Sequence, residues 1–196
     1  FNVGIGKDGG YGITSGSYNT AIGAQTLFTS NTGSNNTAVG YGSLANTTTA
    51  SNNVAVGRSA LNGNTTGTQN VAVGTSALDA NTTGNYNNAL GDGALGSATT
   101  AGANLALGYL SMNATTTGGS NTAVGHQTLD ANTTGIRNTA VGEHALGSQT
   151  TADFTTAVGF SALGSNTTGA SNVAVGGQAL TSNVTGSFNT AVGRSP

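Results

Sequence analysis

The sequence has no cysteine, one proline and very few charged residues. Without cysteine the chain can form neither disulfides nor thiolate metal sites. Only 5% of its 196 residues are charged and the net charge is −2, so it lacks the basic surface with which proteins bind nucleic acid or anionic membranes. It also has no apolar run long enough to span a bilayer. We therefore expect no nucleic-acid partner and no direct membrane contact of this segment.

The dominant feature is a 17-residue repeat that runs through the chain without insertion or deletion. Its first residue defines repeat position 1. Glycine always occupies position 5, an aliphatic residue position 4, and alanine position 3 in every unit but the first. A fixed short period predicts repeated structural units and argues against a disordered low-complexity tract. The twelve units begin at Asn2, Asn19, Asn36, Asn53, Asn70, Asn87, Asn104, Asn121, Asn138, Thr155, Asn172 and Asn189.

The repeat length is that of one coil of a β-solenoid, since 17 residues are too few for a helical or leucine-rich repeat. We predict an all-β fold, a parallel β-solenoid or β-roll, in which residues 1–196 form a single array of about eleven and a half coils. β-Branched residues at positions 2 and 4 predict a strand over positions 1–5, which the glycine of position 5 ends. Positions 7–10, which carry leucine at position 9, predict a second, shorter strand, and positions 11–16 a polar turn.

Stacking the coils would turn every repeat position into a column of equivalent residues. Position 1 would form an asparagine ladder with a gap at Thr155. We expect valine of position 4 and leucine of position 9 to fill the core, which would leave the alanine column of position 3 facing outward as a contact for other chains. On this basis the chain should form a homo-oligomer.

All charged and aromatic residues fall at positions 6, 7, 10, 16 and 17, which predicts that these positions form the solvated outside. If this surface recognises a receptor protein or a glycan on a host, exposed aromatic rings are the best candidates because they offer stacking area at low entropic cost. The candidate recognition residues are Tyr41, Tyr86, Tyr109 and Phe160.

One group of residues could bind a metal ion. Glu143 occupies the same repeat position as His126 one coil later, and His144 follows it, so a site made of two histidines and a carboxylate is conceivable. The favoured interpretation is that these are scattered polar residues of a variable face, because metal sites also need an organised outer shell. We therefore predict no metal, no cofactor and no catalytic residues, and a protein that is not an enzyme.

The repeat also resembles known families. Residues 138–142, followed by Ala145 and Leu146, resemble the head repeats of YadA-like trimeric autotransporter adhesins. Units that contain Asn-Thr-Thr-Gly, such as residues 64–67, resemble the arrays of tail-fibre-like repeat proteins. This resemblance implies a left-handed β-roll, a homotrimer, and a location outside the cell, on the cell surface or on a virion fibre.

The resulting hypothesis is a structural or adhesive segment of an extracellular fibre. The array begins and ends within a unit, and Pro196 would remove a backbone donor at position 8, so we expect a fragment of a longer fibre. The alternative is an ice-binding β-solenoid, since threonines recur at positions 13 and 14. Neighbouring strand residues point to opposite faces, however, so such a pair would not form two columns on one flat face.

Overall fold

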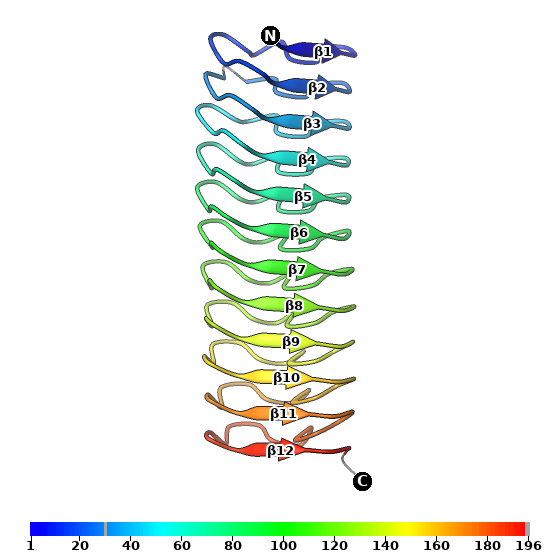
Figure 1. The fold of residues 1–196 in the computed structure, drawn as a ribbon, viewed down its shortest axis with the longest axis vertical. Coiled ribbons are helices and arrows are strands. Elements are labelled where there is room, and N and C mark those ends of the chain that lie inside the picture. Colours follow the sequence, from blue (N-terminus) through cyan, green and yellow to red (C-terminus); the bar gives the residue numbers. More distant parts are fainter. Residues whose placement is uncertain (30, 195–196) are drawn as a thin grey trace.

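The computed structural model describes residues 1–29 and 31–194, and these form a rod of stacked coils (Figure 1). In the described residues each coil contributes one three-residue strand, and the twelve strands form one parallel sheet in sequence order. The predicted parallel β-solenoid with 17-residue coils is confirmed. The strands are β1 (Val3–Ile5), β2 (Thr20–Ile22), β3 (Thr37–Val39), β4 (Val54–Val56), β5 (Val71–Val73), β6 (Asn88–Leu90), β7 (Leu105–Leu107), β8 (Thr122–Val124), β9 (Thr139–Val141), β10 (Thr156–Val158), β11 (Val173–Val175) and β12 (Thr190–Val192).

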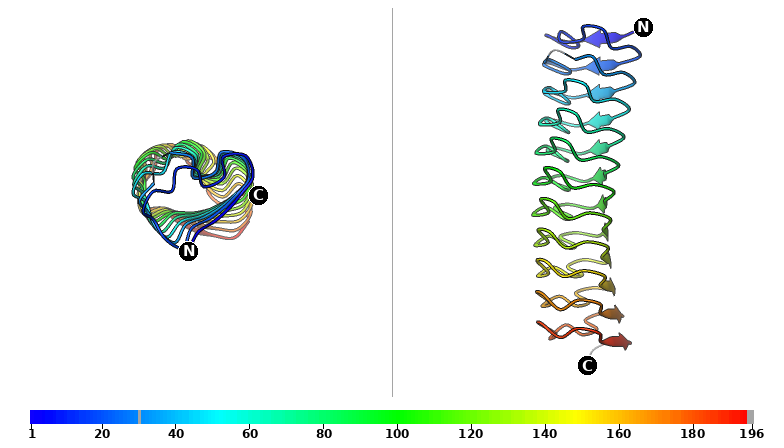
Figure 2. Two further views of the ribbon diagram at one scale, coloured as in Figure 1. Left: turned by 90° about the horizontal axis from the view of Figure 1, so that it is seen from above. Right: turned by 90° about the vertical axis from the view of Figure 1, so that its left-hand side faces the viewer.

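Equivalent residues lie directly over one another, as the column hypothesis requires. Ala72 pairs with Ala89, and Ala89 pairs with Ala106. The coils rotate gradually about the long axis, so the sheet twists along the rod while its register is kept (Figure 2). The termini of the described chain lie at opposite ends of the rod. Pro196, predicted to interrupt the array, lies outside the described residues.

The strands place their side chains opposite to the predicted arrangement. Ala72 at position 3 is fully buried, as are its equivalents from Ala21 to Ala174, whereas Val73 at position 4 is 37% exposed. The prediction that valine fills the core and alanine faces outward is therefore wrong. The interior is narrow because leucine enters it from the facing turn, so only a small residue fits on the strand side. Leu78 at position 9 is fully buried, as predicted for the leucine column.

The predicted second strand is also absent from the described coils. Positions 6–11 form consecutive turns, in which the residues at positions 7 and 9 have left-handed backbone conformations. Leu78, for example, has a φ of 53°. That conformation costs about 1–2 kcal/mol for a residue with a side chain, and burial of a leucine gains about 1.5–3 kcal/mol. Leucine therefore stays at position 9 because it fills the core, despite an unfavourable local conformation.

Backbone hydrogen bonds in these turns still run between coils. The amide of Ser76 donates to the carbonyl of Arg58 in the preceding coil (2.9 Å), and the amide of Leu78 donates to Ala94 in the following coil (3.0 Å). Gly74, at the invariant position 5, has a φ of 135°, and an added Cβ would lie 2.5 Å from the carbonyl oxygen of Gly91. Both the left-handed conformation and the close coil contact thus require glycine at position 5.

The asparagine ladder at position 1 is present and buried. The Oδ1 atom of Asn53 accepts hydrogen bonds from the backbone amide (2.9 Å) and the Nδ2 group (3.2 Å) of Asn70. The Nδ2 group of Asn70 also donates to the carbonyl of Gly84 in its own coil (2.9 Å). Each asparagine therefore links two coils and closes its own coil, which satisfies polar groups that would be costly to bury unpaired.

A second buried ladder occupies position 12 and was not predicted. Asn81 donates from Nδ2 to Oδ1 of Asn64 (2.9 Å), and Asn183 donates to Asn166 in the same way (3.1 Å). The ladder is interrupted at Ala98, whose side chain has no hydrogen-bonding group. The Oδ1 atom of Asn81 has no partner, since the next coil carries Ala98 at this position.

The predicted gap in the position 1 ladder is confirmed at Thr155. The amide of Thr155 still donates to Oδ1 of Asn138 (2.9 Å), but its own hydroxyl donates to the backbone carbonyl of Asp153, two residues earlier (3.3 Å). Within residues 31–194, no hydrogen bond joins the side chain of Thr155 to Asn172 or to the carbonyl of Gly169, which accepts from Asn166. The link between β10 and β11 is weaker there.

We predict that Thr155→Asn restores the hydrogen bonds that the position 1 ladder lacks at Thr155. The new side chain should accept a hydrogen bond from the backbone amide of Asn172 and donate one to the carbonyl of Gly169. These hydrogen bonds should stabilise the fold by about 1 kcal/mol and slow hydrogen exchange of the Asn172 amide about fivefold. The reciprocal control is Asn121→Thr, which should speed exchange of the Asn138 amide by a similar factor. Unchanged exchange at Asn172 in a folded Thr155→Asn protein would contradict the proposed role of the ladder.

Candidate functional surface

The residues at position 6 form a variable column beside the ends of the strands. Each follows the glycine that ends a strand, so the turn carries it out of the sheet. The column contains aromatic, acidic, basic and histidine side chains, and the larger ones are exposed. In the order of the chain it consists of Lys7, Ala24, Tyr41, Arg58, Thr75, Asp92, Tyr109, His126, Glu143, Phe160, Gly177 and Arg194.

The four candidate recognition residues are exposed but do not form one patch. Tyr41, Tyr86, Tyr109 and Phe160 have exposed fractions between 49% and 58%. Tyr41, Tyr109 and Phe160 belong to the position 6 column but lie several coils apart, and Tyr86 lies at position 17. Among the described aromatic contacts none joins two of the four. Their role in recognition stays a prediction, and any ligand that contacts several of them would have to extend along the rod.

Exposed rings instead stack on the equivalent residue of the next coil. The ring centroids of Tyr11 and Phe28 are 5.9 Å apart, and those of Tyr109 and His126 are 5.4 Å apart. The guanidinium carbon of Arg137 lies 5.3 Å from the ring centroid of Phe154. The variable positions therefore also form short ladders, which hold these side chains against the rod.

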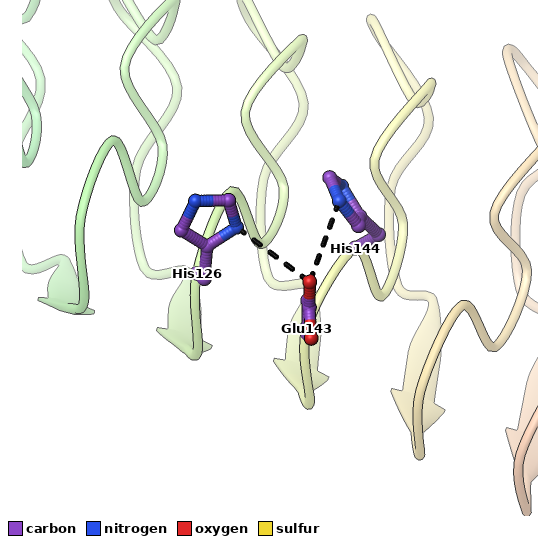
Figure 3. A group of neighbouring side chains, drawn as sticks. All are labelled: His126, Glu143 and His144. Atoms are coloured by element: carbon purple, nitrogen blue, oxygen red, sulfur yellow. Dashed lines mark ion pairs between the residues drawn. The ribbon is translucent and has the colours of Figure 1, made fainter.

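The structure brings His126, Glu143 and His144 together on two neighbouring coils (Figure 3). The Oε1 atom of Glu143 lies 3.9 Å from Nδ1 of His126 and 3.8 Å from Nε2 of His144. The two imidazole rings are 5.6 Å apart and nearly perpendicular. The sequence predicted that Glu143 stacks on His126, and the structure confirms this contact. It also adds His144 as a direct neighbour of both.

A polar hollow of about 360 Å³ lies beside this group, lined by Asp130, His144, Ser148, Ser161 and other small residues. Burial raises the pKa of Asp130, and this effect is partly opposed by backbone hydrogen bonds and by the positive charge that His144 and His126 can carry. Asp79, at the same repeat position three coils earlier, has its pKa raised by burial, with partial compensation from hydrogen bonds that include Ser76. Both aspartates are thus partly desolvated carboxyl groups next to the position 6 column.

In contrast to the variable position 6 column, one face of the sheet is apolar and is formed by the side chains of positions 2 and 4. Position 4 is aliphatic in all twelve strands, and position 2 holds valine, leucine or threonine except at Asn88. Neither position carries a charge. None of these side chains is buried in the described strands, and Val56, Leu107 and Val175 keep 36%, 42% and 36% of their area exposed. The sequence analysis missed this face because it directed position 4 into the core.

Comparison with known proteins identifies no relative. No protein-family model matches the chain, and neither the curated proteins nor the solved structures contain a significant match. Among residues 1–29 and 31–194 there is also no helix with the length and apolarity needed to cross a membrane.

The raised pKa of Asp79 predicts a pH-dependent effect of its removal. An ionised carboxylate at this site destabilises the folded state, so stability rises as the pH falls through the raised pKa towards the unfolded value of 3.8. We expect Asp79→Asn to raise the midpoint of thermal unfolding at about pH 7 and to lose this advantage near pH 4. The control is Asp92→Asn, which removes the same charge from an exposed side chain. An Asp79→Asn effect that is independent of pH would contradict the assignment.

Proposed function

We propose that this chain is a structural segment of an extracellular fibre and that it assembles with further copies of itself. The observation that supports the proposal best is the uninterrupted twelve-stranded sheet, whose outer face is uncharged and carries an aliphatic residue at position 4 of every strand. Each added repeat contributes one coil, which lengthens the rod without changing its cross-section. Such a rod is suited to hold two attached parts of a fibre apart.

The internal hydrogen bonding supports a mechanical role. Backbone amides of one coil donate to both neighbouring coils, as those of Ser76 and Leu78 do, so each coil is tied to the coils before and after it. The buried asparagine ladder adds side-chain links along the same axis. Bending or stretching such a rod would strain many of these bonds together, which favours a stiff shaft.

The apolar sheet face is the natural contact between chains. At about 4.8 Å per strand and three residues per strand it measures about 50 by 10 Å, or about 1,000 Å² for a pair, which is the lower limit of a specific interface. A second copy of the chain fits best because its aliphatic columns have the same spacing and equally lack charge. A trimer, as in the adhesins and fibres that the repeat resembles, would cover this face on every chain around a shared axis.

Recognition would then belong to the variable positions that remain outside. Tyr41, Tyr86, Tyr109 and Phe160 offer rings to a host-surface protein or glycan along the length of the rod. This arrangement suits a surface adhesin or a virion fibre. The proposal involves no catalytic step.

Self-association can be tested by light scattering after size-exclusion chromatography. The chain has a mass of 18.8 kDa, and we expect a species with a multiple of this mass. The double variant Val73→Lys/Val124→Lys, which places two cations on the sheet face, should shift the species to the monomer because a buried unpaired charge opposes association. The matched control is Thr83→Lys/Thr134→Lys, which adds the same charges to exposed residues of the same coils and should leave the assembly intact.

A monomeric wild-type protein at all accessible concentrations would refute the assembly. Persistence of the oligomer in the sheet-face variant would place the contact elsewhere. Circular dichroism of both double variants confirms that the solenoid still forms.

Ice binding is a second candidate because the structure exposes one regular threonine column. The threonines of position 14 are exposed in ten consecutive coils, from Thr32 to Thr185 at intervals of 17 residues. Those of position 13 are half-buried, and their hydroxyls donate to the next coil, as Thr82 does to the carbonyl of Thr99 (3.0 Å). Of these two positions in the described coils, only position 14 presents a column of exposed threonines, as expected if the pair does not form two columns on one face.

The two candidates differ in a freezing assay. The fibre proposal predicts no thermal hysteresis and no shaping of ice crystals at about millimolar protein. If hysteresis is found, Thr83→Lys/Thr134→Lys should abolish it when the position 14 column binds ice. If the wild type shows hysteresis and this variant does not, the protein binds ice through position 14 and the fibre proposal is wrong.

A further inference from the structure

We propose that His126, Glu143 and His144 form a binding site for a divalent transition-metal ion, with Zn²⁺ as the reference ligand. One ligand atom of each residue lies within 4.8 Å of the other two. Figure 3 shows the carboxylate of Glu143 between the two imidazole rings, with one of its oxygens directed at both. This site is independent of the fibre proposal and would bind its ion in a single rod or in an assembly.

The composition of the chain makes this cluster distinctive. The sequence has two histidines and one glutamate, and all three are in the cluster. Two imidazoles and one carboxylate are a donor set that suits Zn²⁺, Cu²⁺ and Ni²⁺. Ca²⁺ and Mg²⁺ are poor candidates because they require six or more oxygen ligands.

The backbone fixes the positions from which the three side chains extend. His126 and Glu143 are equivalent residues of adjacent coils, so their separation equals the strand spacing of about 4.8 Å. The amide of His144 donates to the carbonyl of His126 (3.1 Å), and His144 has a left-handed φ of 55°. This conformation turns His144 to the same side as Glu143, whereas consecutive residues of a strand would point to opposite sides.

Neighbouring groups restrict the rings further. Tyr109 stacks on His126 at 5.4 Å with only 15° between the ring planes. On the other side, His144 and Asp130 line the same polar hollow, where the aspartate adds negative potential near the site. These contacts limit the orientations that the two rings can take.

Rotation of the side chains would close the site around an ion. Tetrahedral Zn²⁺ with ligand distances of about 2.0–2.2 Å holds its ligand atoms about 3.3–3.5 Å apart. The two distances to Glu143, 3.8 and 3.9 Å, exceed this by about half an ångström, and all three ligand atoms lie within 4.8 Å of one another. The side chains of His126, Glu143 and His144 are 47%, 54% and 42% exposed, so they can move without repacking the core. Three protein ligands leave a fourth position open to water.

The direct test is a calorimetric titration of the tag-free full chain with ZnCl₂ at about pH 7.5. We expect one Zn²⁺ per chain, with no competition from Mg²⁺. His126→Gln and His144→Gln should each weaken binding at least about tenfold, and Glu143→Gln should weaken it because it removes the only charged ligand. The control Asp92→Asn removes an acid from the same column two coils before His126 and should leave the affinity unchanged.

Two further measurements separate this site from nonspecific binding. In NMR spectra of the unmutated chain, both imidazoles should shift together and saturate at one equivalent of Zn²⁺. The affinity should fall by at least about tenfold between about pH 7.5 and pH 5.5, since protons compete for the imidazole nitrogens. Equal Zn²⁺ binding by the wild type and by His126→Gln/His144→Gln, or imidazole signals that do not respond to Zn²⁺, would overturn the proposal.

Discussion

The structure depends on the stacking of each residue over its equivalent one coil away. Because every coil has 17 residues, the hydrogen bond formed at one position recurs at the same position along the rod. The position 1 ladder is an example of such recurring hydrogen bonds. One asparagine side chain bonds to the neighbouring coil and also to the carbonyl at position 15 of its own coil. An inserted residue would shift all following positions out of these contacts, which explains why the repeat length is constant.

The registry also explains why the core is narrow and uniform. Alanine from the strand and leucine from the facing turn, with Met112 in its place in one coil, are both buried in the central coils, as Ala72 and Leu78 are. The leucine adopts a left-handed conformation that its side chain disfavours, so packing outweighs local preference there. Because the interior has no room for variation, chemical diversity is confined to the outside.

Two kinds of surface result, and they support different roles. The sheet face repeats the same aliphatic residues and suits contact with another copy of the same periodic rod. The position 6 column changes in every coil and can carry individual features, of which the cluster of His126, Glu143 and His144 is the clearest. In a fibre, the uniform face would hold the assembly together, while the variable column would face the surroundings.

The sequence alone determined the coil length, a strand within positions 1–5, the glycine turn, the asparagine ladder with its gap at Thr155 and the stacking of Glu143 on His126. All of these follow from periodicity, because equal spacing along the chain becomes vertical alignment in space. Only the tertiary structure decided which side of the strand faces inward, since alternation separates Ala72 from Val73 without saying which is buried. It also decided that positions 6–11 form turns and that His144 points towards Glu143, because left-handed backbone there depends on hydrogen bonds between coils.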